Sequence, residues 1–225
     1  MKTAQTFTVA ILSALLASAA IAAPEEASTT SAAPNPALLD PSLADATAPE
    51  TFKAKVETTA GDFVIEVHRE WAPHGADRFF NLVKIGYFDN VAFFRVIEGF
   101  MAQAGMNGDP EVSRAWLNAR IKDDPVVRSN TPGTVTFAMS AEPNSRSAQI
   151  FINYGNNSYL DASGFAPFGQ VVEGFEIVKA LYSGYGEGEP NGNGPSQAKL
   201  YRRGNDYLKA EFPKLDYIVR ATIVE

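Results

Sequence analysis

Short runs rich in β-branched and aromatic residues recur from residue 53 to the end of the chain, and they restrict its fold more than any other feature. The first two, 53–59 and 62–68, are separated by Ala60 and Gly61, which predicts a β-hairpin. Further β-prone runs, several of them bounded by glycine or proline, lie at 92–97, 100–104, 134–139, 149–153, 168–172 and 217–224. Many short strands of this kind favour a mainly β barrel, in which the last run closes an otherwise exposed sheet edge.

Two segments predict helices that accompany the sheet. In 74–85, apolar side chains recur at helical spacing, and 174–182 is interpreted as a second helix. Two longer stretches, about 107–132 and 183–213, interrupt the series of strands and are interpreted as insertions. The second contains 197–212, whose Lys, Arg, Glu, Leu and Ala content predicts a short helix on the outside of the barrel. We interpret this helix mainly as a solvated surface element.

The start of the chain has the pattern of a secretory signal peptide. Lys2 precedes an apolar run at 7–22 that ends in small residues, and this run is shorter than the about 20 residues of a membrane span. We therefore expect a signal peptide at 1–22, a soluble exported product without a membrane span, and a bacterial periplasm as its location. Residues 23–52, rich in Ala, Pro, Ser and Thr, predict a flexible linker, although a specific docking arm stays open as an alternative. The folded domain is expected at 53–225.

Charge and residue usage exclude several classes of function. Nineteen Lys and Arg against 26 Asp and Glu give a net charge of −7, so the chain has no surplus of basic residues to neutralise nucleic-acid phosphates. Nucleic acid is therefore not an expected partner. The chain has no Cys and two His, so thiol catalysis, disulfides and Cys- or His-rich zinc sites are excluded. The glycine-rich stretch 184–194 lacks the Lys-Ser/Thr ending of a phosphate loop and is interpreted as a flexible insertion.

Four blocks, in order, carry a resemblance to a known family. They are 86–105, 133–140, 147–153 and 159–174, and they resemble the core motifs of cyclophilin-type peptidyl-prolyl cis-trans isomerases. The resemblance covers roughly 56–178 and the last strand. It implies a closed eight-stranded antiparallel barrel capped by two α-helices, to which this chain adds a helical insertion near its C-terminus.

The same resemblance implies a set of site residues. Arg95 matches the family's catalytic arginine. The residues that match the proline pocket are Phe100, Met101, Phe151 and Leu160, and those that match polar substrate contacts are Gln103 and Gln149. Two further substrate-binding positions are implied at Tyr159 and at Phe165, where the family often has a His or an aromatic residue, and a backbone donor is expected from Ser140 or Ala141. The chain departs from the usual pattern at Phe94, Glu98 and Ala104, and Tyr159 stands where a Trp is common, which puts binding of the family's cyclic-peptide inhibitor in doubt.

These residue types suit rotation about an X–Pro bond. The reaction must overcome amide resonance, a barrier of about 18–20 kcal/mol, but makes and breaks no covalent bond. It therefore needs no nucleophile, metal or cofactor, and its substrates are expected to be proline-containing unfolded or extended polypeptides whose folding it assists. Two alternatives stay open: a cyclophilin-like binding module or chaperone with little catalysis, and a barrel that carries a small apolar ligand in a hollow interior.

Overall fold

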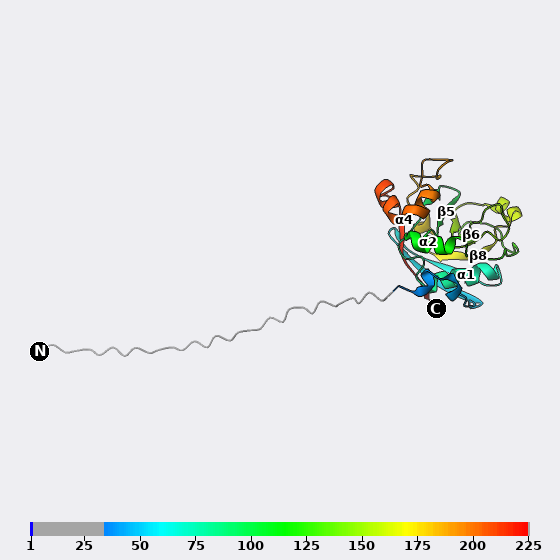
Figure 1. Ribbon diagram of the computed structural model, residues 1–225, viewed down its shortest axis with the longest axis horizontal. Coiled ribbons are helices and arrows are strands. Elements are labelled where there is room, and N and C mark those ends of the chain that lie inside the picture. The colour runs from blue at the N-terminus through cyan, green and yellow to red at the C-terminus, as the bar shows by residue number, and fades with distance from the viewer. Residues whose placement is uncertain (2–33, 225) are drawn as a thin grey trace. The chain divides into compact units, whose positions relative to one another are not determined.

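The computed structural model describes Met1 and residues 34–224 (Figure 1), so the rest of the predicted signal peptide and the first part of the predicted linker lie outside the described residues. The strands are β1 (Thr51–Thr58), β2 (Gly61–His68), β3 (Val91–Ala92), β4 (Arg95–Ile97), β5 (Met101–Ala104), β6 (Thr134–Phe137), β7 (Ile150–Asn153), β8 (Pro167–Glu173) and β9 (Tyr217–Val224). The α-helices are α1 (Pro73–Lys84), α2 (Pro110–Leu117), α3 (Phe175–Lys179) and α4 (Gln197–Glu211), and the 3-10 helices are η1 (Pro36–Leu38), η2 (Pro41–Leu43) and η3 (Ser158–Ser163). None of the helices in this part of the chain has the length and apolarity that a bilayer span requires.

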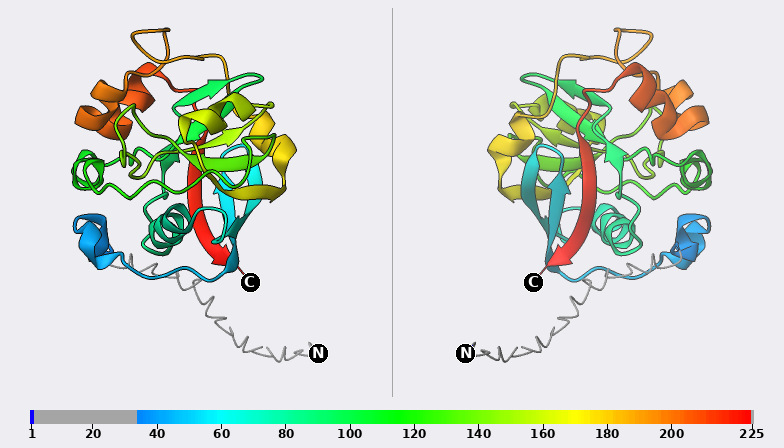
Figure 2. Two further views of the ribbon diagram at one scale, coloured as in Figure 1. Left: turned by 90° about the vertical axis from the view of Figure 1, so that its right-hand side faces the viewer. Right: turned by 90° about the vertical axis from the view of Figure 1, so that its left-hand side faces the viewer.

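The nine strands form one curled antiparallel sheet in the order β3-β9-β1-β2-β8-β6-β7-β5-β4. The predicted hairpin is confirmed, with β1 and β2 paired from Thr51 opposite His68 to Thr58 opposite Gly61. Figure 2 shows the long β9 beside this hairpin, where it pairs with β1. Every second residue of β1, beginning with Phe52, is buried, as the two-residue period of a strand with one face on a core requires. The mainly β, antiparallel class that the sequence predicts is therefore confirmed.

The two ends of the sheet are formed by consecutive segments of the chain. β3 pairs with β9 and β4 pairs with β5, and only Phe93 and Phe94 separate them. Both rings are buried, Phe93 in the main core and Phe94 in a second, smaller core. The backbone N–H of Phe93 donates to the carbonyl of Asp216 at 2.9 Å. The single strand predicted at 92–97 is thus divided where two neighbouring side chains enter different cores.

Helix α1 covers the sheet with an apolar face. Phe79 and Leu82 are almost completely buried, and the Phe79 ring lies 5.0 Å from that of Phe168 on β8. Pro73 occupies the first turn, where its missing N–H costs nothing. Residue 72 supplies no side-chain cap, and instead the carboxylate of Asp124 accepts from the backbone N–H groups of His74 and Gly75 at 3.0 and 2.9 Å.

The first insertion is held by a helix and a buried ion pair. Helix α2 begins at Pro110, and Asp109 caps it by accepting from the N–H of Glu111 at 2.7 Å. Beyond α2, the Asp124 carboxylate lies 3.0 Å from the guanidinium of Arg146, and both side chains are about 1% exposed. Because a buried charge needs a partner, this pair fixes the path of residues 107–132 across the end of α1.

The second insertion differs from the solvated surface element that its composition predicts. Helix α4 lies where expected, but Leu200, Tyr207 and Leu208 are buried in the second core with Phe94. The helix is kinked at Gly204, whose φ of 56° brings it against Gly108 of the first insertion. A side chain at residue 204 would collide with the Gly108 carbonyl oxygen. The four α-helices of the described residues thus exceed the two that the family resemblance implies.

Residues 34–50 also differ from the flexible linker predicted over 23–52. This segment contains η1 and η2, and Ala37 and Ala48 within it are buried. Its backbone exchanges hydrogen bonds with the Asn81 side chain of α1 through Ala46, at 3.1 and 2.7 Å, and the Leu38 carbonyl accepts from the Trp116 indole at 3.0 Å. Compositional bias does not reveal such partners, because they are supplied by side chains elsewhere in the chain.

Candidate functional site

A cavity of about 240 Å³ brings together most of the predicted site residues. Its lining comprises Arg95, Phe100, Met101, Gln103, Ala138, Met139, Phe151, Leu160, Phe165 and Gln197. Seven of these were predicted, and the sequence gives no separate signal for Ala138, Met139 or Gln197. Among the described residues no group of three or more acidic or histidine side chains is placed to hold a metal ion.

Strand register explains why these side chains share one face. Arg95 on β4 lies opposite Gln103 on β5, and Gln103 lies opposite Phe151 on β7. Residues directly opposite on neighbouring strands present their side chains to the same side of the sheet. Met101, two residues before Gln103, follows the same alternation, whereas Ala102 and Ala104 face the main core.

The walls of the cavity are aromatic and thioether surfaces. The rings of Phe151 and Phe165 lie 5.8 Å apart in an edge-to-face arrangement. The Arg95 guanidinium carbon lies 5.7 Å from the Phe100 ring centroid, and its Nη1 lies 4.0 Å from the Met101 sulfur. A cation therefore stands at the mouth of an apolar hollow, an arrangement in which hydrogen bonds are stronger than in bulk water.

A chain of amides leads away from the arginine. Arg95 Nη1 donates to Gln103 Oε1 at 3.0 Å, and Gln103 Nε2 donates to Gln149 Oε1 at 2.8 Å. The Gln149 amide then donates to the Gln197 carbonyl oxygen at 3.2 Å and to the Tyr201 hydroxyl at 3.1 Å. Burial raises the pKa of Tyr201, and the hydrogen bond from Gln149 partly offsets this rise. The second insertion thus supplies the end of the network.

Glu187, also from the second insertion, forms an ion pair with the arginine. Arg95 Nε donates to Glu187 Oε1 at 2.7 Å and Nη2 donates to Oε2 at 2.6 Å. The hydrogen bond from Arg95 is the main reason why the pKa of Glu187 is lowered. Nothing in the glycine-rich stretch 184–194 indicates this role, because the contact joins residues 92 positions apart.

The remaining predicted residues lie around the cavity. Ser140 and Gln149 line a neighbouring cavity of about 450 Å³, which shares Gln103, Ala138, Met139 and Gln197 with the first. Ala141 is exposed and lines neither cavity. Tyr159 is 62% exposed and also lies outside both linings, although it directly precedes Leu160. The structure therefore places these four at the periphery of the pocket.

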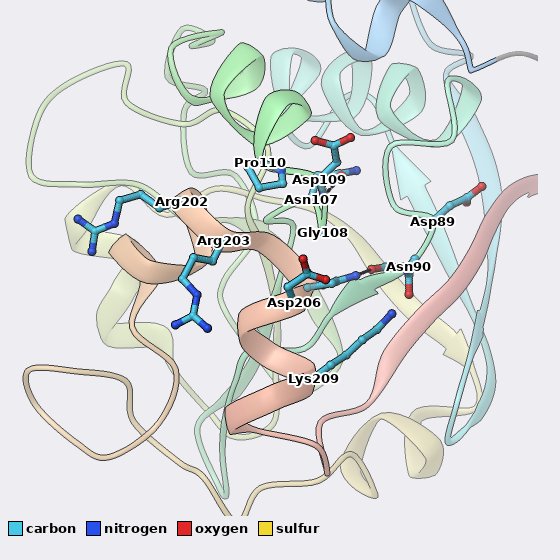
Figure 3. A pocket seen from close by; sticks show the side chains of 11 residues that line it. Asp89, Asn90, Asn107, Gly108, Asp109, Pro110, Arg202, Arg203, Asp206 and Lys209 are labelled. Carbon is cyan, nitrogen blue, oxygen red and sulfur yellow. Dashed lines mark hydrogen bonds between the residues drawn. The ribbon is translucent and has the colours of Figure 1, made fainter.

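A larger hollow of about 920 Å³ lies between α4 and the loop before α2 (Figure 3). Its lining is polar, with carboxylates such as Asp109 and Asp206 and with basic side chains from α4. Arg202 and Arg203 extend to one side of the helix and Lys209 to the other. None of the predicted site residues lines it, and its mixed charge selects no ligand class.

Comparisons with known proteins agree with one another. Residues 53–199 match a family model described as cyclophilin type peptidyl-prolyl cis-trans isomerase. A peptidyl-prolyl cis-trans isomerase of Acinetobacter baylyi is 33% identical over 144 residues, which are 62% of this chain and 76% of the relative. Peptidyl-prolyl cis-trans isomerase B of Escherichia coli is 33% identical over 132 residues, 55% of this chain and 80% of the relative. A crystal structure of a Cryptosporidium parvum cyclophilin type isomerase, solved in the presence of the dipeptide Ala-Pro, has a TM-score of 0.56 at 21% identity and covers 77% of this chain and 99% of its own.

Proposed function

Because the chain belongs to the cyclophilin-type peptidyl-prolyl cis-trans isomerase family, we propose that it isomerises X–Pro bonds in the cavity beside Arg95. The observation that carries this assignment is the position of the guanidinium at the mouth of the apolar hollow, with Nη1 4.0 Å from the Met101 sulfur. A hollow of this kind suits the pyrrolidine ring of proline, which has no polar group to satisfy. The residue before proline then remains outside and is able to turn.

Arg95 is proposed to stabilise the half-rotated bond. When the amide twists, resonance is lost and the imide nitrogen recovers a lone pair that accepts a hydrogen bond. A fixed guanidinium N–H favours this state over both planar isomers, which is the condition for catalysis. The Phe100, Met101, Phe151 and Leu160 side chains hold the ring meanwhile, with Phe165 closing the hollow against Phe151.

Orientation must supply part of the rate. A thousand- to ten-thousand-fold acceleration needs about 4–5.5 kcal/mol, whereas a hydrogen bond to a charged group contributes roughly 1.5–3 kcal/mol. We assign the remainder to desolvation and to substrate contacts from Gln103 and Gln149, which restrict rotation to one bond. Ser140 and Ala141 are proposed to bind the substrate backbone at the neighbouring cavity, and Tyr159 to contact the chain at the rim.

The substrates proposed are proline-containing unfolded or extended polypeptides, since a pocket for one ring accepts proline only where the flanking chain is exposed. The leader pattern at 1–22 supports export, and with it a role in folding in a bacterial periplasm, where slow X–Pro isomers delay refolding.

The finer architecture is also part of the proposal. Because β3 and β4 are separated by two residues and stand at opposite ends of the sheet order, we treat them as one strand bent at Phe93 and Phe94. Counted so, the sheet is an eight-stranded antiparallel barrel that closes on this strand, and the bend places Arg95 directly after the closure.

The deciding experiment is a protease-coupled isomerisation assay on a proline tetrapeptide. Arg95→Ala is expected to lower kcat/KM at least a hundredfold, because the N–H that meets the imide nitrogen is lost, with an unchanged circular dichroism spectrum. Arg220→Ala, which removes an exposed arginine of β9 paired with Glu57, is the matched control and keeps the full rate. Rates of the native chain and of Arg95→Ala that both stay at the uncatalysed level, with peptide binding retained, favour instead a binding module with little catalysis.

A further inference from the structure

We infer that Glu187 is a positioning residue that fixes the Arg95 guanidinium at the mouth of the pocket before substrate arrives. The inference rests on the proposed catalytic role of Arg95 and deepens it. It assigns a task to the second insertion, whose glycine-rich start is interpreted from sequence alone as a flexible surface loop.

The ion pair leaves the working edge of the arginine available. The carboxylate takes one N–H each from Nε and Nη2, and Gln103 takes one from Nη1. A guanidinium has five N–H groups, so two remain that have no oxygen acceptor in the protein. One of them is on Nη1, the nitrogen that lies against Met101 in the pocket lining. Glu187 itself does not line the pocket, so it contacts the arginine on the side away from the pocket.

The loop that carries Glu187 is closed on itself. The carbonyl of Glu187 accepts from the N–H of Gly194 at 2.8 Å, and its Oε1 accepts from the N–H of Gly188 at 2.9 Å. At Gly192 a side chain would collide with the Glu187 carbonyl oxygen, so this close approach requires glycine. The glycines therefore allow the loop to pack tightly around the backbone of Glu187.

The same loop is anchored to the body of the protein just before Glu187. The Tyr185 ring packs edge to face on Tyr182 and on Phe212, each at 5.0 Å. The Ser183 hydroxyl donates to Glu98 in the turn after β4 at 2.8 Å. A side chain held by a packed and hydrogen-bonded support keeps its partner within a narrow range of positions, which is what a catalytic group requires.

The expected contribution is one of preorganisation. Arginine has many rotamers, and a guanidinium that samples them must be ordered again in each catalytic cycle. With Glu187 on one side and Gln103 on the other, that ordering is complete in the free enzyme. The edge of the Arg95 guanidinium that pairs with Glu187 is the one away from Met101. The geometry therefore favours a positioning role over an inhibitory one, in which the carboxylate would compete with substrate for the arginine.

The test measures kcat and KM of full-length variants on a proline tetrapeptide. Glu187→Ala is expected to lower kcat/KM on the order of tenfold, mainly through kcat, and Glu187→Gln, which retains an acceptor of the same size, to recover part of the loss. Glu189→Gln is the matched control: it lies two residues along the loop, is paired with Lys199 and is expected to keep the native rate.

A second readout follows the arginine directly. In 15N spectra the Arg95 Nε–H signal is expected to be sharp in the native chain, broadened in Glu187→Ala and intermediate in Glu187→Gln. An unchanged or higher kcat in Glu187→Ala, while Arg95→Ala is inactive, overturns the positioning role and leaves the proposed function intact. Full activity of Arg95→Ala removes both.

Discussion

Three arginines show how the partner of a side chain decides what it does. Arg95 is paired with a carboxylate that is itself one-third exposed, and it lines the candidate site. Arg146 is paired with Asp124 at 1% exposure and serves the fold. Arg78 donates to the backbone carbonyls of Ala119 and Ser147, and burial lowers its pKa to about 10. Only the first arrangement combines a fixed charge with access to a cavity.

The Arg95–Glu187 pair predicts how activity depends on pH. Because the pKa of Glu187 is lowered in the folded protein, the carboxylate stays charged, and the pair intact, above the ordinary glutamate pKa of about 4.3. The pair is lost only as the pH falls through the lowered pKa. We expect the ratio of native to Glu187→Gln rates to be constant from pH 8 to about pH 4.3 and to approach one only as the pH falls further, through the lowered pKa of Glu187, in rates measured while circular dichroism shows a folded chain. A ratio that already falls between pH 8 and 6 contradicts this.

Among individual residues, the sequence predicts those that line the pocket but not those that contact them from the second insertion. Arg95, Gln103 and Phe151 stand in contiguous motifs, so a resemblance transfers them directly. Glu187 and Tyr201 reach the site from an insertion, and their roles depend on a contact between distant segments that neither periodicity nor local composition encodes.

Among the elements, helix α1 depends on a cap from outside its own sequence. Asp124 accepts from the first N–H groups of α1 and pairs with Arg146. Asp124→Ala removes the nearer carboxylate partner of the buried Arg146, leaving Asp123 at 3.4 Å, and also leaves two N–H groups of α1 without their acceptor. It is expected to lower the free energy of unfolding by about 3–5 kcal/mol, measured by urea titration at pH 7. Glu142→Ala, which breaks the exposed pair with Arg120, is the control and changes stability by less than about 1 kcal/mol. Similar losses in both variants contradict a structural role for the buried pair.

The local signals of the helices differ in how much they reveal. α1 is predicted within one residue, because its apolar period and Pro73 lie in its own sequence. α2 has a readable start in Asp109 and Pro110, but it lies in a stretch interpreted only as an insertion. α4 is placed correctly, yet its buried face depends on Phe94 and on the kink at Gly204, which composition cannot reveal.

For the whole molecule, residues 34–50 tie the start of the described chain to α1 and α2. A chain that begins at residue 51 loses hydrogen bonds to Asn81, Asp77 and Trp116. Because a hydrogen bond within the protein contributes about 0.5–1.5 kcal/mol to stability, we expect the shorter chain to be less stable in thermal or urea unfolding than a chain that begins at residue 34, by on the order of 1–3 kcal/mol. Isomerase activity is expected to be unchanged, since the segment lines neither of the two cavities at the site. Equal stability of the two chains argues that the segment contributes nothing to the fold.

The close approach of Gly204 to Gly108, where the N–H of Asn205 donates to the Gly108 carbonyl at 2.9 Å, joins the two insertions through their backbones. The two insertions therefore depend on each other, because the first forms the surface against which helix α4 of the second bends. If the first insertion is shortened, the second loses the surface on which it packs, and Glu187, which the second insertion carries, is expected to lose its position beside Arg95. The two insertions are therefore expected to occur together in related chains. A design that transfers one of them to a shorter barrel must include the other.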